Sequence, residues 1–103
     1  MTFQAACLTL IVPRELREEL FDYINEQSDL VTGFTALEAA GHGARVRLRT
    51  PAEQVKGHAD AVAVSIVLQE KDVERLLERL RSAFAGTKLV YWAVPVTAFG
   101  SID

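Results

Sequence analysis

The chain has little of what marks several classes of protein. Its one cysteine, Cys7, excludes an internal disulfide framework and a multi-cysteine zinc site. The longest largely apolar run, Ala61 to Leu68, falls far short of the ~20 residues needed to cross a bilayer. Acidic residues outnumber basic ones by 14 to 11, so the net charge is -3 and a general nucleic-acid-binding face is not expected. These absences predict a protein with no nucleic-acid partner and no direct membrane insertion.

The composition fits one domain that spans residues 1–103, because single domains commonly have this length. The N-terminus shows no basic segment followed by an apolar stretch and a small-residue cleavage site, so we expect a cytoplasmic protein. Half of the residues are hydrophobic, which is a high fraction for so small a domain. This excess suggests that part of the apolar surface is buried between subunits.

Hydrophobic periodicity predicts four strands and two helices. Apolar residues recur at helical spacing in two segments, 13–26 and 70–85. The segments typical of strands are 4–12, 30–38, 58–68 and 88–96. The order βαββαβ predicts an α+β, ferredoxin-like sandwich, in which a four-stranded antiparallel sheet carries two helices on one face.

Three of the predicted strands are apolar on both faces. In the third, the alternating sets are Val62, Val64, Ile66, Leu68 and Ala61, Ala63, Ser65, Val67. A sheet with helices on one face should turn polar side chains to water on the other. Because this sheet does not, we expect its helix-free face to meet other copies of the chain, in a homo-oligomer of cyclic symmetry.

The segment 39–57 is predicted to be a long loop, since hairpins need only two to five connecting residues. Arg45, Arg47 and Arg49 alternate with apolar residues, which would place three guanidinium groups on one side of a projecting ribbon. Such a charged arm suits an anionic partner, either a phosphate-bearing small molecule or an acidic protein surface. The alternative is a solvated arm that only maintains solubility.

The two histidines of the chain, His42 and His58, lie near the two ends of this loop, and Glu38 and Asp60 lie nearby in sequence. If the ends of the loop converge, these four side chains could hold a divalent transition metal. The alternative is a pair of surface histidines without a metal, because their spacing is not a ligand signature.

Three other features have both a structural and a functional interpretation. The segment Gly41-His42-Gly43 suits an anion-binding nest or a hinge. Cys7 is expected to be a small core residue, and Tyr91 and Trp92 are expected to pack rather than to stack on a ring. No arrangement of residues typical of nucleophilic catalysis is present, so we expect a protein that is not an enzyme.

Four short motifs, together with the element order and the long loop, resemble a known family. They are Gly33-Phe34-Thr35, Gly41-His42-Gly43, Glu53-Gln54-Val55-x-Gly57 and Tyr91-Trp92-x-Val94-Pro95-Val96. The chain resembles a short family of unknown function within the PII-like superfamily, which also contains CutA. Its members are often encoded beside heavy-metal efflux systems. The resemblance implies a homotrimer, a projecting T-loop at residues 39–57 and effector-binding clefts between subunits.

In nucleotide-binding PII proteins, the turn after the second helix is a phosphate loop. The corresponding turn here, residues 85–88, keeps Gly86 and Lys88 but not the full Gly-Asp-Gly-Lys pattern. The resemblance therefore implies an effector, an adenine nucleotide among the candidates, near Gly41, His42, Gly43, Gly86, Thr87 and Lys88. No tyrosine lies in residues 39–57, so the covalent switch of the nitrogen regulators is not expected.

The resemblance favours a PII-like regulator whose loop engages a target, such as a heavy-metal efflux transporter. The alternative that we keep is a CutA-like protein that binds a divalent metal through His42 and His58.

Overall fold

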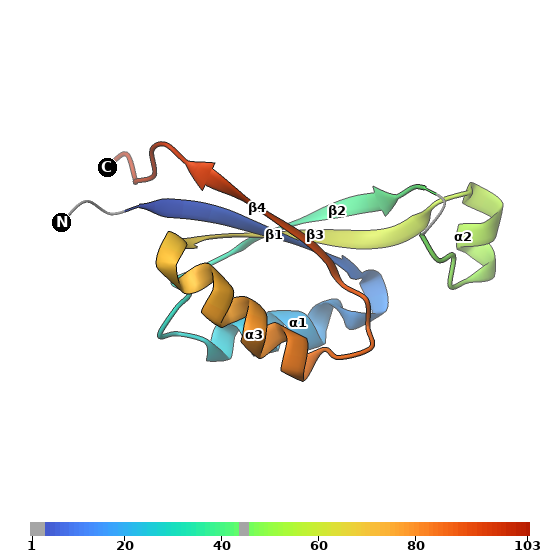
Figure 1. The fold of residues 1–103 in the computed structure, drawn as a ribbon. Helices are drawn as coiled ribbons and strands as arrows, with labels where there is room; N and C mark the ends of the chain where they lie inside the picture. Colours follow the sequence, from blue (N-terminus) through green and yellow to red (C-terminus); the bar gives the residue numbers. More distant parts are fainter. Residues whose placement is uncertain (1–3, 44–45) are drawn as a thin grey trace.

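The computed structural model describes residues 4–43 and 46–103 and confirms the predicted element order (Figure 1). Two 3-10 turns, Arg14–Leu16 and Glu70–Asp72, lead into the two main helices. The strands and helices are β1 (Ala5–Pro13), α1 (Arg17–Glu26), β2 (Thr35–Gly41), α2 (Pro51–Lys56), β3 (Ala59–Gln69), α3 (Val73–Ala83) and β4 (Val90–Val96).

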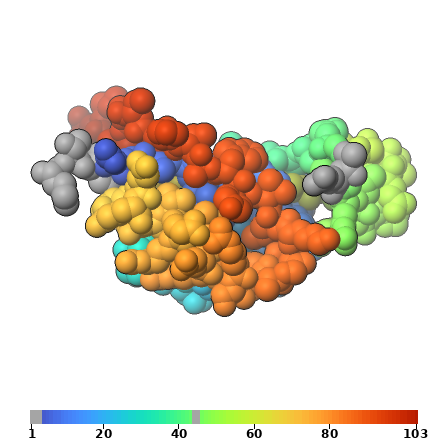
Figure 2. Space-filling view, in the orientation of Figure 1, coloured from blue at the N-terminus to red at the C-terminus, as the bar shows by residue number. Residues whose placement is uncertain are grey.

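The strands form one antiparallel sheet in the order β2-β3-β1-β4, and α1 and α3 cover one of its faces (Figure 1). This is the predicted ferredoxin-like sandwich. The β2–β3 hairpin and α2 extend to one side of the two-layered body, which gives an elongated shape of 51 × 29 × 24 Å (Figure 2). None of the described helices is long and apolar enough to span a bilayer.

The core lies between the sheet and the two helices. Alternate residues of β1 and β3 point toward the helices, among them Leu8, Leu10, Val64 and Ile66, each at most 2% exposed. They pack with residues at helical spacing, Leu20 and Ile24 of α1 and Leu76, Leu77 and Leu80 of α3. Because full burial of one such side chain contributes about 1.5–3 kcal/mol, this cluster holds the two layers together.

The second strand lies further along the chain than the predicted 30–38. Leu30 and Val31 are buried, but they belong to a turn after α1, where both backbone N–H groups donate to the carbonyl of Gln27. Their apolar character reflects this turn packing on the core. β2 itself is a mostly exposed edge strand, which explains why its sequence gives a weak signal.

The predicted loop 39–57 contains a short helix that periodicity did not reveal. The Thr50 hydroxyl accepts from the backbone N–H of Glu53, and the Glu53 carboxylate accepts from the backbone N–H of Thr50, so a capping box begins α2. Gly57, with φ of 80°, ends it. The predicted ribbon is wrong for residues 46–49, which form no strand, and Arg45 lies outside the described residues.

The sheet face opposite α1 and α3, which we call the open face, is apolar as predicted. Its exposed side chains, by strand register, are Leu37 (63% exposed), Val90 (56%), Trp92 (49%) and Val94 (48%). Cys7 is half-buried on this face, opposite Val94, so the prediction that it is a core residue is wrong. The open face lacks a covering layer within the described chain.

Candidate functional site

A pocket with an empty volume of about 660 Å³, part of it open to solvent, lies at the base of the projecting hairpin. It is bounded by the end of β1, the end of β2, the start of β3, the segment 46–49 and the start of β4. Ile11, Ala61 and Val90 supply apolar surface to it.

Three cationic residues, Arg47, Arg49 and Lys88, line this pocket. Arg49 donates through Nη1 to Oε1 of Glu15 at 3.2 Å, so its charge is already paired. Neither Arg47 nor Lys88 forms an ion pair with an acid among residues 4–43 and 46–103. These two cations are therefore the ones available to an anionic ligand.

Lys88 also has an unusual backbone. Its φ is 59°, and it is the sole non-glycine residue with a positive φ in the part of the chain that the structure describes. A side-chain-bearing residue in the left-handed region costs about 1–2 kcal/mol. Strained residues of this kind are common at ligand-binding positions, so the backbone of Lys88 also favours a ligand-binding role for this residue.

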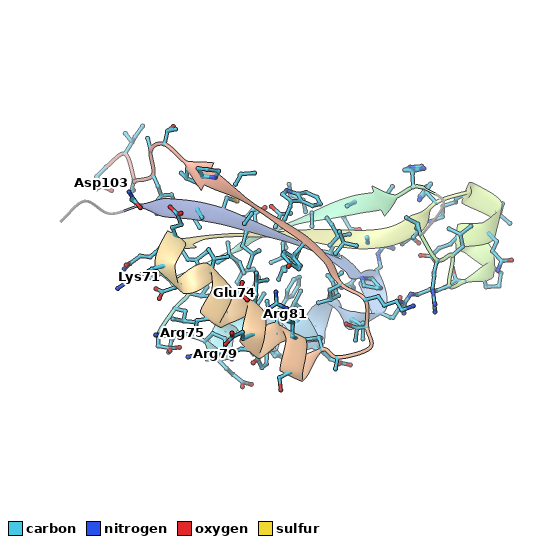
Figure 3. The ribbon with its side chains drawn as sticks, in the orientation of Figure 1. Lys71, Glu74, Arg75, Arg79, Arg81 and Asp103 are labelled. Carbon is cyan, nitrogen blue, oxygen red and sulfur yellow. The ribbon has the colours of Figure 1, made fainter. Side chains whose placement is uncertain are left out.

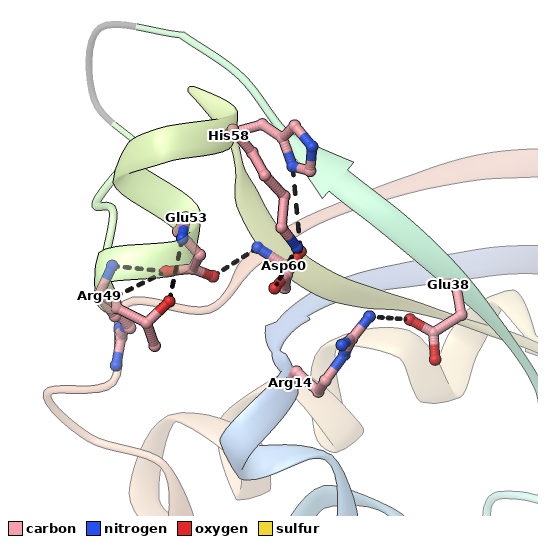
Figure 4. A network of polar contacts seen from close by, with 8 residues as sticks. Arg14, Glu38, Arg49, Glu53, His58 and Asp60 are labelled. Carbon is pink, nitrogen blue, oxygen red and sulfur yellow. Dashed lines mark hydrogen bonds and ion pairs between the residues drawn. The ribbon is translucent and has the colours of Figure 1, made fainter.

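The acid Glu53 also lines the pocket, but its carboxylate is fully used within the chain (Figure 4). The side chain is buried, and it accepts from the backbone N–H groups of Asp60 (2.5 Å), Arg49 (2.5 Å) and Thr50 (3.2 Å). These donors, Asp60 first, hold the pKa of Glu53 below its ordinary value. The ionised carboxylate thus ties α2 and the segment before it to the start of β3.

Two further ion pairs fix the neighbouring acids (Figure 4). Lys56 donates to both carboxylate oxygens of Asp60 at 3.0 Å, which lowers the pKa of Asp60. Arg14 donates to Glu38, and this contact raises the pKa of the Arg14 guanidinium. Both acids are therefore engaged by cations in the structure.

The two histidines converge, as the metal hypothesis requires. The ring centroids of His42 and His58 are 5.3 Å apart. Oδ1 of Asp60 lies 4.0 Å from Nδ1 of His58, whereas Glu38 is turned toward Arg14. No group of three or more metal-ligating side chains forms among residues 4–43 and 46–103, so the four predicted ligands are not assembled as one set.

The predicted effector residues fall into several places. Gly41 and Lys88, 47 positions apart, line the same pocket. Gly86 lines an adjoining pocket that shares Lys88, and the Thr87 hydroxyl donates to the Phe84 carbonyl at 2.6 Å, at the end of α3. His42 and Gly43 are outside the lining of both pockets.

Sequence reasoning missed Glu53 as a residue of this site. The signal that could have found it is Thr50-Pro51-Ala52-Glu53, which combines a capping box with a proline at the first helical position.

Solved structures with the same fold define the class. A structure of CPII, a nitrogen regulatory PII-like protein from Thiomonas intermedia K12 bound to ADP, AMP and bicarbonate, matches with a TM-score of 0.71 and 18% identity, over 97% of this chain and 98% of that one. A candidate PII-like signalling protein from Thermus thermophilus matches with a TM-score of 0.65 and 17% identity, over 91% and 88% of the two chains. The fold is therefore PII-like.

The particular family follows from the sequence profile that matches residues 2–103: the chain belongs to DUF3240, described as a protein family of unknown function. A DUF3240 protein from Shewanella baltica OS155 has a similar structure, with a TM-score of 0.78, 16% identity and full coverage of both chains. No curated protein matches the sequence significantly. The predicted resemblance to a PII-like family of unknown function is confirmed.

Proposed function

We propose that this protein is a PII-like regulator that binds a phosphate-bearing small molecule in the pocket at the base of its projecting hairpin. The observation that carries the proposal is the joint lining of this pocket by Gly41, Arg47 and Lys88. They bring two cations without an acidic partner in the described chain beside an apolar surface. That combination suits a ligand with an anionic group and an apolar ring.

The proposal includes a homotrimer in which the open faces meet. The exposed Trp92, Val94 and Leu37 form an apolar surface that water would otherwise cover. Ile11 and Val90 are paired on the open face and also line the pocket. A subunit covering the open face would therefore reach the rim of the pocket, which makes the effector site a cleft between subunits.

Adenine nucleotides are the first effectors to test. The Thiomonas protein with the same fold was solved with ADP, AMP and bicarbonate. In the present chain, Lys88 and Arg47 would meet the phosphates. At Gly41, a side-chain Cβ would lie 3.4 Å from Val46 Cγ1 and 3.5 Å from Ala59 Cβ, which are ordinary contact distances, so this part of the pocket wall is closely packed.

The experiment is calorimetric titration of the full chain with ATP, ADP, AMP and bicarbonate. Lys88→Ala should weaken the binding of the nucleotide by tenfold or more, because the ammonium group is removed from the pocket. The matched control is Lys71→Ala, since Lys71 is an exposed lysine at the opposite end of the molecule (Figure 3). Absence of binding by the wild type, or equal losses in both variants, would refute the proposed effector site.

We also propose that the output of the regulator is a protein contact rather than catalysis. Arg47 is exposed on the segment that leads into α2. In Figure 1, α2 lies at the far end of the projecting hairpin. An effector bound against Arg47 would change the exposure and charge of this segment, and ordering of a segment by a ligand is a known mode of switching. A heavy-metal efflux transporter as the target stays a prediction.

A further inference from the structure

The two histidines occupy a cross-strand pair position just beyond the β2–β3 ladder. The last ladder pair joins Gly41 to Ala59, and the same register continued by one residue sets His42 opposite His58. Directly opposed residues of an antiparallel pair hold their side chains close together on one face. The backbone therefore brings the rings together, and their centroids lie 5.3 Å apart with planes inclined at 48°.

This separation is compatible with a shared metal ion. A bond of about 2.0–2.1 Å from zinc to an imidazole nitrogen, plus roughly 1.1 Å from that nitrogen to the ring centre, places each centroid about 3.2 Å from the ion. At a tetrahedral angle the two centroids are then about 5.2 Å apart. The observed 5.3 Å is close to this value.

The surroundings of His58 supply a second, independent observation. Its Nδ1 is buried and has no hydrogen-bond partner in the described chain. Oδ1 of Asp60 lies 4.0 Å from this nitrogen, too far for a hydrogen bond, while the other ring nitrogen faces away from Asp60 (Figure 4). A rotation of the ring that brings Nδ1 into hydrogen-bond range of Asp60 would give the recurrent arrangement in which a carboxylate orients a histidine whose other nitrogen binds metal.

We propose that His42 and His58 bind one divalent transition-metal ion per chain, of the zinc, copper or nickel kind that favours imidazole. Asp60 acts as a positioning residue for His58. Since no third protein ligand stands with the pair in the described residues, water or another small ligand completes the coordination. The ion would join the two ends of the segment between the histidines and so fasten the base of the hairpin. The inference does not depend on the effector proposed above.

The test is calorimetric titration of the full chain with zinc chloride, without nucleotide. The wild type should bind one ion per chain, and His42→Ala should weaken binding by tenfold or more. Because His42 is exposed, this variant should fold normally. Asp60→Asn should weaken binding about tenfold through loss of ring orientation. Cys7→Ser is the control and should bind as the wild type does.

A second readout identifies the ligands directly. The chain has two histidines, so substoichiometric Cu²⁺ should broaden both sets of imidazole NMR signals together. The proposal is overturned by any of three results: no saturable binding by the wild type, unchanged binding by His42→Ala, or broadening of one imidazole alone. Lys88→Ala should keep its zinc affinity, which separates failure of the metal site from failure of the effector site.

Discussion

Replacing Trp92 with aspartate should break the proposed assembly of open faces. Trp92 is 49% exposed in the isolated chain. A large aromatic side chain buries about 150–250 Å², so roughly 100 Å² of Trp92 is left for a partner to cover. At about 25 cal/mol per Å², covering it stabilises each interface by about 2.5 kcal/mol. Losing this term alone would weaken association roughly 70-fold, and an aspartate facing apolar neighbours adds a desolvation cost.

The assay is light scattering or sedimentation velocity at micromolar concentrations. The wild type should sediment as a trimer, and Trp92→Asp should shift toward single chains. Tyr91→Asp is the matched control, because Tyr91 is adjacent and 45% exposed but lies on the helix side of the sheet. A wild type that remains a single chain, or a Tyr91 variant that dissociates as readily, would show that the open face is not the interface.

Three further substitutions address the hairpin base and the pocket. Glu53→Gln should speed amide hydrogen exchange in α2. The stability that this carboxylate contributes is present above the pKa of an unfolded glutamate and is lost as pH falls through the lower pKa of the folded state. Acidification should therefore destabilise the wild type more than the variant. Lys88→Gly should have a free energy of unfolding about 1 kcal/mol higher than that of Lys88→Ala, because glycine relieves the left-handed backbone. Denaturant titration measures the difference, and equal stabilities would contradict this. Arg47→Glu should abolish capture of a target in pull-downs while light scattering shows an unchanged oligomer; undiminished capture would remove the proposed role of Arg47.

The strands and helices of the body could be predicted because their periodicity is set by the core. β3 and α3 place apolar residues at spacings of two and of three to four, and each spacing corresponds to a buried face. β2 was misplaced because an edge strand buries little, whereas Leu30 and Val31 are buried without forming a strand. A hydrophobic sequence pattern therefore indicates that a segment is buried, but it does not by itself show that the segment forms a strand.

The candidate site was less predictable, because it depends on which partner each charged side chain chooses. The sequence allowed Glu38 to join the histidines, but the fold presents it to Arg14 instead. The role of Glu53 depends on three backbone N–H groups, one of them seven residues away on β3, which no local pattern encodes. The convergence of His42 and His58, by contrast, follows from hairpin topology alone.

The two proposed sites lie together at the base of the hairpin, and the contacts of Asp60 link them. Asp60 donates its backbone N–H to Glu53, and its carboxylate contacts Lys56 and faces His58. Asp60 thus contacts the Glu53 side chain of α2, faces His58 and lines the pocket. A ligand that moves Asp60 must alter all three, and because binding free energies are reciprocal, whatever a metal does to effector affinity the effector does to metal affinity. Asp60 is paired with Ala40 in the β2–β3 ladder, and its other contacts, Glu53 and Lys56, belong to α2, so we expect such a displacement to act on α2.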